Sequence, residues 1–178
     1  MAPSIGNAQI LAPAFLLPIM SLSDKTLFLA SRGEHYYTTL ICFFFPDDLI
    51  AGAMAVQLAL WFWAGCSKLN HHFPGVVSVM CSNSPVIPFK AVKKAMYKNW
   101  PDDLRVSGLA KLMAHLGTLA EFSIPLFLGI LPGELSLVIG LCVMVLMHTF
   151  ITSSIPMAVP IEWNFHVVYG GFFLFLFF

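Results

Sequence analysis

Lys68 directly follows a long uncharged apolar stretch, and its position could give it a chemical role. Trp61 and Trp63 precede it, and Asn70, His71 and His72 follow within four positions. A lysine at the end of an apolar helix commonly anchors that helix at the membrane surface. A desolvated amine instead releases its proton more readily and can serve as a base. Adjacent histidines on a helix point about 100° apart and do not readily share one ion. The sequence therefore leaves both roles of Lys68 open and predicts no metal site.

A second group of polar residues interrupts the apolar stretch 109–131. Its members recur at helical spacing, which places them on one face of a helix: Lys111, His115, Thr118 and Glu121. A charged side chain at the bilayer centre costs roughly 2.5 to 3.5 kcal/mol, so we expect this face to turn inward. Glu121 and His115 could then transfer protons or hold a polar cofactor. Alternatively, Lys111 extends to the interface and Glu121 pairs with a basic group of the bundle.

His148 begins a third polar group, at the end of the stretch 135–155. Two threonines and a serine follow it closely, ahead of Pro156. A histidine can act as an acid or a base near neutral pH. It can equally form a hydrogen bond between helices as a neutral imidazole. His166 lies beside Trp163 and Asn164 and is typical of a membrane-interface residue.

Composition indicates which kind of protein positions these groups. The chain has 178 residues, of which 58% are hydrophobic and 10% charged, against roughly 25% charged in an ordinary soluble domain. This composition is typical of an integral membrane protein and argues strongly against a water-soluble monomer. The formal net charge is zero, so no positive excess is available for a phosphate backbone and we predict no nucleic-acid partner.

The apolar residues are distributed in stretches long enough for helices that cross a membrane. Residues 49–67 are uncharged over 19 positions, which nearly spans a ~30 Å hydrocarbon core at ~1.5 Å per residue. We predict one all-α membrane domain over 1–178, a polytopic bundle of about four to five transmembrane helices and one interfacial amphipathic helix. Pro3, Pro13 and Pro18 interrupt the N-terminal apolar region, in which we expect a broken or re-entrant segment over 8–22. The expected spans are 36–46, 49–67, 109–131, 135–155 and 163–178.

The loop 68–108 separates two spans and is basic. The stretch from Lys68 to Lys111 holds seven of the nine lysines and arginines, which places this loop on the positive, cytoplasm-like side of the membrane. Within it, residues 89–100 place Phe89, Val92, Met96 and Trp100 on one helical stripe, with lysines on the remaining surface. This pattern predicts an interfacial helix. It would face anionic lipid head groups or an acidic partner, or would be an ordinary juxtamembrane helix.

Several motifs resemble a known family. The run FWAGCSKLNHHFPGVVSVMCSNSPVIPFK resembles a segment of vitamin K-dependent gamma-carboxylase and of the wider horizontally transferred transmembrane domain (HTTM) family. That segment has an aromatic-x-Ala-Gly-x-x-Lys-Leu core and a later Ser-Pro-Phe-Lys-like element. The runs DKTLFLASRGEHYYTTL, HLGTLAEFSIPLFLGIL and MHTFITSSIPMAVPIEWNF look like further pieces of the family in the same order. The resemblance covers about residues 24 to 178.

This resemblance implies roles for three residues. Lys68 would be the active-site base that deprotonates a reduced quinone, and His35 and His148 would be polar residues of the same cavity. An enzyme of this kind would be carboxylase-like. The chain departs from the carboxylase in lacking the soluble C-terminal part that receives the protein substrate.

Two classes of function follow from the sequence. The first is a noncatalytic accessory subunit of a larger membrane complex, of respiratory or photosynthetic type, with other membrane proteins and lipids as partners. The second is a membrane enzyme or quinone-binding protein that uses Lys68 with His35, His148 or Glu121 around an apolar cavity. A quinone or a pigment is the expected type of cofactor, and no residue selects between them. A transporter would usually carry a repeat, which we do not find.

Overall fold

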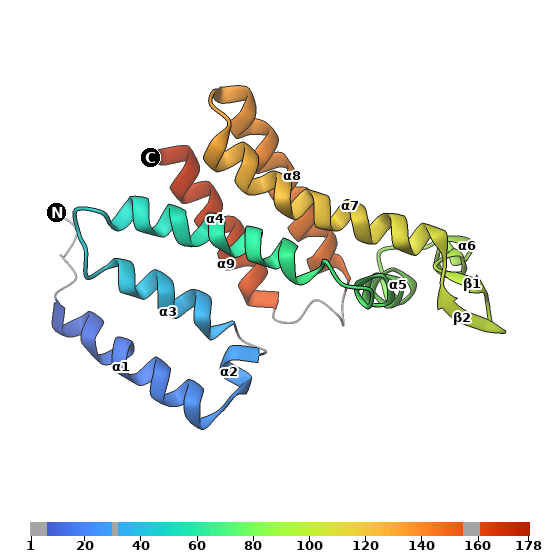
Figure 1. The fold of residues 1–178 in the computed structure, drawn as a ribbon, viewed down its shortest axis with the longest axis horizontal. Coiled ribbons are helices and arrows are strands. Elements are labelled where there is room, and N and C mark those ends of the chain that lie inside the picture. The colour runs from blue at the N-terminus through green and yellow to red at the C-terminus, as the bar shows by residue number, and fades with distance from the viewer. Residues whose placement is uncertain (1–6, 30–31, 155–160) are drawn as a thin grey trace.

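A computed structural model describes residues 7–29, 32–154 and 161–178 and consists almost entirely of helices (Figure 1). The predicted all-α helical membrane fold is confirmed. The elements in chain order are α1 (Asn7–Ser23), α2 (Thr26–Leu29), α3 (Gly33–Cys42), α4 (Leu49–Ser67), α5 (Phe73–Asn83), α6 (Lys90–Ala95), β1 (Tyr97–Asn99), β2 (Asp103–Val106), α7 (Gly108–Pro125), the π-helix η1 (Leu126–Ile130), α8 (Glu134–Ser153) and α9 (Ile161–Phe177).

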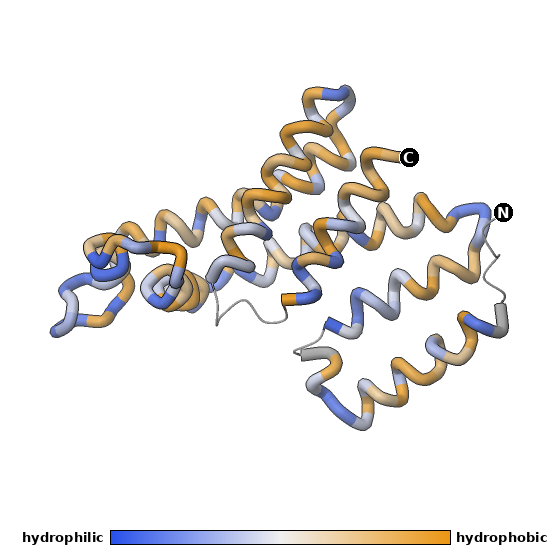
Figure 2. Tube along the Cα trace, turned by 180° about the vertical axis from the view of Figure 1, so that it is seen from behind, coloured by the Kyte–Doolittle hydropathy of each residue, from blue (hydrophilic) through white to orange (hydrophobic). Residues whose placement is uncertain are grey.

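Within these described residues, three helices are long and apolar enough to cross a membrane. They are Leu49–Ser67, Gly108–Ile130, in which α7 continues into η1, and Glu134–Ser153. The apolar helices Gln9–Ser23 and Ile161–Phe177 are shorter. Figure 2 shows that apolar residues run along most of these helices and that polar residues gather at their ends. The stretch expected at 135–155 ends two residues beyond α8, and its last residue, Ile155, lies outside the described residues.

The N-terminal apolar stretch forms one continuous helix, so the break expected at its prolines within 8–22 is not found, while a re-entrant path into the membrane stays a prediction. Pro13 and Pro18 both lie inside α1. Each proline removes one backbone donor, but membrane helices tolerate such a loss where neighbouring groups compensate for the freed carbonyl. α1 packs along α3, which in turn packs along α4 (Figure 1).

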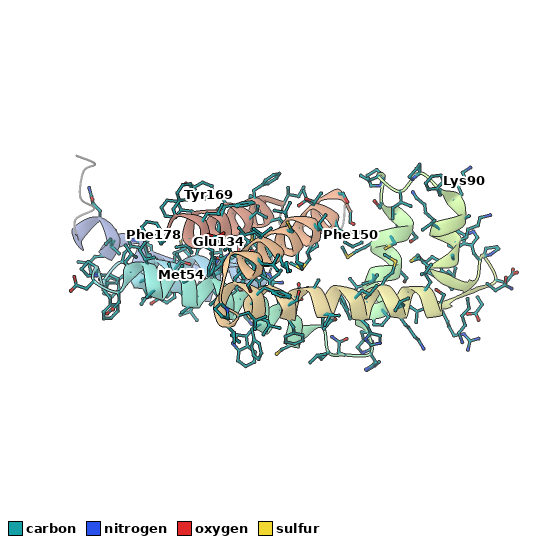
Figure 3. The ribbon with its side chains drawn as sticks, turned by 90° about the horizontal axis from the view of Figure 1, so that it is seen from above. Met54, Lys90, Glu134, Phe150, Tyr169 and Phe178 are labelled. Atoms are coloured by element: carbon teal, nitrogen blue, oxygen red, sulfur yellow. The ribbon has the colours of Figure 1, made fainter. Side chains whose placement is uncertain are left out.

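α7 connects the two ends of an elongated molecule (Figure 1). α4 and α8 pack on it toward its C-terminal end, and α5 crosses it nearer its beginning. Figure 3 shows Lys90 of α6 at the opposite end from Phe178, the last residue. The loop between α4 and α5, which contains Lys68, lies between these two parts.

Two apolar clusters stabilise this arrangement. The larger cluster joins α4, α7, α8 and α9 through Trp61, Ile124, Leu141, Met144, Val167, Leu174 and Phe175. The smaller joins α5, α7 and Met96 through Val77, Cys81, Ala110 and Ala114. Burial in these clusters removes apolar side chains from both lipid and water and fixes α4 and α5 relative to α7.

The interfacial helix expected over 89–100 is shorter than predicted. α6 ends at Ala95, and residues 97–106 form a small antiparallel hairpin. Met96 turns inward and is fully buried, and the Met96 carbonyl accepts a hydrogen bond from the Ser107 backbone N–H. Trp100 precedes Pro101, which disfavours helical geometry at the tryptophan. The helical periodicity assumed for 89–100 therefore holds only as far as Ala95. The lysines and the exposed aromatic residues of this stretch still lie in the same part of the molecule.

Candidate functional site

A cavity of about 290 Å³ lies among α4, α5, α7, α8 and α9. Most of its wall is apolar, and the larger apolar side chains are aromatic or sulfur-containing: Trp61, Phe73, Met80, Met113, Met147, Phe150 and Trp163. Lys68, Glu121, His148 and Asn164 also line it. A largely apolar wall with a few convergent polar groups is the usual composition of a small-molecule site.

Lys68 and Glu121 form an ion pair at this cavity. The Lys68 ammonium donates a hydrogen bond to Oε1 of Glu121. Lys68 is the residue that ends α4, while Glu121 lies 13 positions after the start of α7, well inside its apolar length. Of the two roles expected for Glu121, the structure shows pairing with a basic group of the bundle, which is Lys68. Glu121 is 3% exposed, and a carboxylate buried to this extent requires such a partner.

Two buried polar atoms of residues that line the cavity have no hydrogen-bond partner in the part of the chain that the structure describes. One is the second carboxylate oxygen of Glu121, Oε2, and the other is the indole nitrogen of Trp163, Nε1. Both atoms are buried, and both residues line the same cavity. The first can accept a hydrogen bond and the second can only donate one. Buried polar groups in native proteins nearly always have partners, so this pair indicates a place for a molecule that supplies them.

His148 is held between two other helices. The indole N–H of Trp61 donates to Nε2 of His148 over 3.2 Å. Nδ1 of His148 lies 2.9 Å from Oδ1 of Asn164. Because an indole can only donate, Nε2 is the accepting nitrogen, and Nδ1 carries the proton that it donates to Asn164. His148 is therefore a neutral imidazole. Its two nitrogens form hydrogen bonds that join α8 to α4 and to α9.

His35 differs because one of its nitrogens is free. Nε2 lies 3.2 Å from Oε1 of Gln57, and the Gln57 amide donates to the backbone carbonyl of Val167 over 3.0 Å. The amide orientation makes Nε2 of His35 the donor, so Nδ1 is left with an unshared electron pair. Nδ1 is buried and has no partner. Of the two histidines, His35 has the geometry of an available proton acceptor.

His35 lines a second cavity, of about 330 Å³, that adjoins the first. Arg32, Ala64, Ser67 and Trp163 line both. The guanidinium carbon of Arg32 lies 5.5 Å from the centroid of the Trp163 ring, within the range of a cation–π contact. Trp163 therefore borders both cavities, of which one is lined by the Lys68–Glu121 pair and the other by His35.

The polar face expected on residues 109–131 is only partly turned inward. Thr118 and Glu121 are buried, whereas Lys111 and His115 are exposed. The buried stripe consists of Ala110, Ala114, Thr118, Glu121 and Ile124, because α5 packs on the two alanines. Lys111 and His115 each follow one of these alanines and fall outside the contact. His115 lines neither cavity, so the structure does not bring it together with Glu121.

Sequence reasoning missed Gln57, Trp61, Trp163 and Arg32 as parts of this site. Gln57 had a usable signal, since it is a polar amide in the middle of an uncharged span. The tryptophans had none, because tryptophan is common in membrane helices for reasons of packing and interface position. His166 lies with its ring centroid 5.3 Å from that of His35. Among the described residues, no group of three or more metal-ligating side chains gathers around one point.

This arrangement can bind a molecule with a polar end and an apolar body. Around the polar end it offers a cation, a carboxylate with a free oxygen and an indole donor. In a comparison with known protein families, residues 3–178 match the model of a family described as transmembrane protein of unknown function (DUF3556). The chain belongs to this family. Together with the apolar helices, membership places the chain among integral, multi-pass membrane proteins.

The resemblance to gamma-carboxylase and HTTM proteins is wrong. The family match covers almost the whole chain, and it is to a different family, DUF3556. No curated protein and no solved structure matches the chain. A lysine that ends an apolar, aromatic-rich helix is a feature that membrane proteins acquire independently, so a short motif built around it does not identify a family. The base and quinone chemistry drawn from the resemblance loses its support.

Proposed function

We propose that this protein binds a lipophilic molecule with a hydroxyl-bearing head in the cavity beside the Lys68–Glu121 pair. The observation that carries the proposal is the pair of buried, unpartnered atoms at one cavity, Oε2 of Glu121 and Nε1 of Trp163. A hydroxyl group both donates and accepts, so one such group within reach would satisfy both atoms.

The rest of the cavity supports a lipophilic body for this molecule. Its volume of about 290 Å³ is close to the lower end of the ~300 to 1,000 Å³ typical of small-molecule sites. Trp61, Phe73 and Phe150 offer aromatic surface, and methionines from three helices offer adaptable contacts. The adjoining cavity of about 330 Å³ gives a longer molecule additional space.

The charge pair favours a neutral head. Lys68 and Glu121 already compensate each other, so a carboxylate or an ammonium would leave one charge of the three without a counterion. A hydroxyl adds a hydrogen bond to the free oxygen of Glu121 without adding charge. Bonds to an ionised acceptor are stronger than bonds between neutral groups, which would make this contact the main source of head-group selectivity.

Gly117 provides a variant that fills the cavity without disturbing the ion pair. It lies on α7, lines the cavity and has open space where a Cβ would stand. Gly117→Leu would therefore project a side chain into the space of the bound molecule. Gly75 in α5 also has open space around a Cβ but lines neither cavity. Gly75→Leu is the matched control.

The test is native mass spectrometry of the full chain after gentle detergent extraction, with identification of the small molecules that it carries. We expect one lipophilic, hydroxyl-bearing molecule per chain in the unaltered protein and in Gly75→Leu. We expect it to be lost from Gly117→Leu, whose helical content by circular dichroism should match that of the control. A folded Gly117→Leu protein that keeps the molecule, or unaltered protein that carries none, contradicts the proposal.

The same experiment addresses the role of accessory subunit, which stays a prediction. Its support is compositional, and the exposed apolar side chains of α1, α8 and α9 are surfaces that lipid covers as well as a neighbouring subunit would. Migration with other membrane proteins would favour the subunit role. The ligand proposal is separate, because the cavity is built from this chain alone.

A further inference from the structure

A third cavity, of about 250 Å³, lies at the end of the molecule that carries α6 and the hairpin. Three lysines of α6 line it, together with Tyr97, Trp100 and the last residues of α5. None of its lining residues lines either of the other two cavities. Figure 3 shows one of its lysines, Lys90, far from Met54 and Phe178 of the main helix cluster. This cavity is therefore a separate feature of the fold.

The three lysines concentrate positive charge on one face. Lys93 and Lys94 lie three and four positions after Lys90 along α6, which makes both side chains neighbours of Lys90 on the helix. Like charges at this spacing repel each other. In the part of the chain that the structure describes, no carboxylate lies within ion-pair distance of these three ammonium groups. Nearby Asp103 is engaged by the Arg105 guanidinium at 2.7 Å. The cluster therefore lacks an anion.

The other walls of the cavity are held in place by contacts of their own. The Tyr97 hydroxyl and Ser82 Oγ are hydrogen-bonded at 2.9 Å. Nδ2 of Asn83 donates to the backbone carbonyl of Val79, also over 2.9 Å. The rings of Tyr97 and Trp100 lie 5.4 Å apart between centroids. The three lysines thus line a cavity whose other walls are fixed by hydrogen bonds and ring contacts. They are not simply distributed over a solvated helix face.

Apolar side chains are exposed around the same recess. Val86, Phe89, Trp100 and Leu104 are all solvent-accessible, and Phe89 is 68% exposed. Figure 2 shows polar and apolar residues interleaved in this part of the chain. Lysines beside exposed aromatic and aliphatic residues are characteristic of a surface that lies at the level of lipid head groups. An acidic soluble partner would need the lysines but not this apolar surround.

We propose that the cavity between α5, α6 and β1 binds the phosphate head group of an anionic phospholipid. Lys90, Lys93 and Lys94 would supply ammonium groups to the phosphate oxygens. Tyr97 and Trp100 would contact the glycerol region, and Phe89 and Val86 the beginning of the acyl chains. The expected position of the loop 68–108 on the positive side of the membrane agrees with this assignment.

A charge-matched pair of variants tests the site. Lys90→Gln/Lys93→Gln/Lys94→Gln removes the three lysines of the cavity. Lys25→Gln/Lys98→Gln/Lys111→Gln removes three exposed lysines that do not line it, so both proteins have the same net charge. The full chain in detergent is titrated with phosphatidylglycerol or with phosphatidylcholine, and bound lipid is counted by native mass spectrometry. Replacement of all three cavity lysines by arginine should preserve binding, since the charge and the donors remain.

We expect the cavity variant to bind phosphatidylglycerol about tenfold or more weakly than the unaltered chain, with the control variant changed far less. We expect phosphatidylcholine to bind weakly to all of them. Equal losses in both glutamine variants would overturn the proposal, because general charge would then explain the affinity. Displacement of the lipid by millimolar inorganic phosphate would overturn it in favour of a free phosphate site. Binding that is unaffected by either variant would leave an acidic protein as the alternative partner for these lysines and would also overturn it.

Discussion

Lys68 and Glu121 form an ion pair between the end of α4 and the middle of α7, across 53 positions of sequence, and use only one of the two carboxylate oxygens. The pair compensates a charge that α7 could not otherwise bury inside its apolar length. The unused oxygen belongs to a residue that lines a cavity with a mostly apolar wall. The same contact therefore joins two helices and provides one polar end of the candidate ligand site.

Glu121→Gln should destabilise the protein by about 2 to 3 kcal/mol, because it leaves the Lys68 ammonium without its counterion. The value lies below that of a fully buried pair, since the Lys68 side chain is 23% exposed and partly screened. Unfolding by sodium dodecyl sulfate in mixed micelles, followed by helical circular dichroism, measures the change.

Comparison with Lys68→Met and with the double variant Lys68→Met/Glu121→Gln separates pairing from burial. If the ion pair is the relevant contact, the double variant should be more stable than the sum of the single changes predicts. Additive losses would show that the two side chains act independently.

Trp61→Phe should cost about 3 kcal/mol, whereas Trp63→Phe should change stability by less than about 0.5 kcal/mol. Trp61 is 1% exposed and its N–H is the donor to His148, so the substitution leaves both a void and an unpaired acceptor. Trp63 lies two positions away and is 67% exposed. The same unfolding assay compares the two variants, and similar losses would refute the assigned role of the Trp61–His148 bond.

The sequence was most informative about the helices and least informative about their partners. The stretch 49–67 lacks charge and is bordered by Asp48 and Lys68, so composition alone defines it, and it is the helix α4. Hydrophobicity could not show that Pro13 and Pro18 lie within a continuous α1, because compensation for the lost donors depends on tertiary surroundings. It also could not indicate the hairpin, in which Met96 leaves the helical stripe to fill a cluster against α7.

The site was predictable as a set of costly polar residues but not as a geometry. Lys68, Glu121 and His148 are conspicuous in apolar surroundings, and the structure places all three at one cavity. His115 is as conspicuous and is exposed, because helical spacing gives the shared face but not the neighbour that covers it. The partners that orient the histidines, Trp61 for His148 and Gln57 for His35, come from α4 and depend on how the helices cross.

The hairpin offers a test by pH, outside the membrane-spanning helices. Hydrogen bonds from the Arg105 side chain lower the pKa of Asp103 from 3.8 to about 2. A carboxyl group with a lowered folded pKa stabilises the fold above its unfolded pKa, and this stabilisation is lost as the pH falls from about 4 to about 2. Carbon-13 NMR of the carboxyl should therefore show Asp103 titrating near 2 in the unaltered chain. In Arg105→Gln its titration should move toward that of an ordinary aspartate, and an unchanged midpoint would contradict the pairing.

The packing of α8 against η1 depends on the absence of a side chain at Gly140. A Cβ at this position would stand 2.5 Å from Cδ2 and 2.8 Å from Cγ of Leu128, and 3.1 Å from the Cβ of Phe127. Cγ of Leu128 and Cβ of Phe127 lie close to the backbone, so the helices would have to separate. Gly140→Ala should then destabilise the protein by about 1 to 3 kcal/mol, even though alanine is the better helix former.

Gly75→Ala meets open space in α5 and should leave stability unchanged or raise it by up to about 1 kcal/mol. Opposite signs for the two alanines in the same unfolding assay would support close packing at Gly140, and a gain at both would show that α8 and η1 can move apart at little cost.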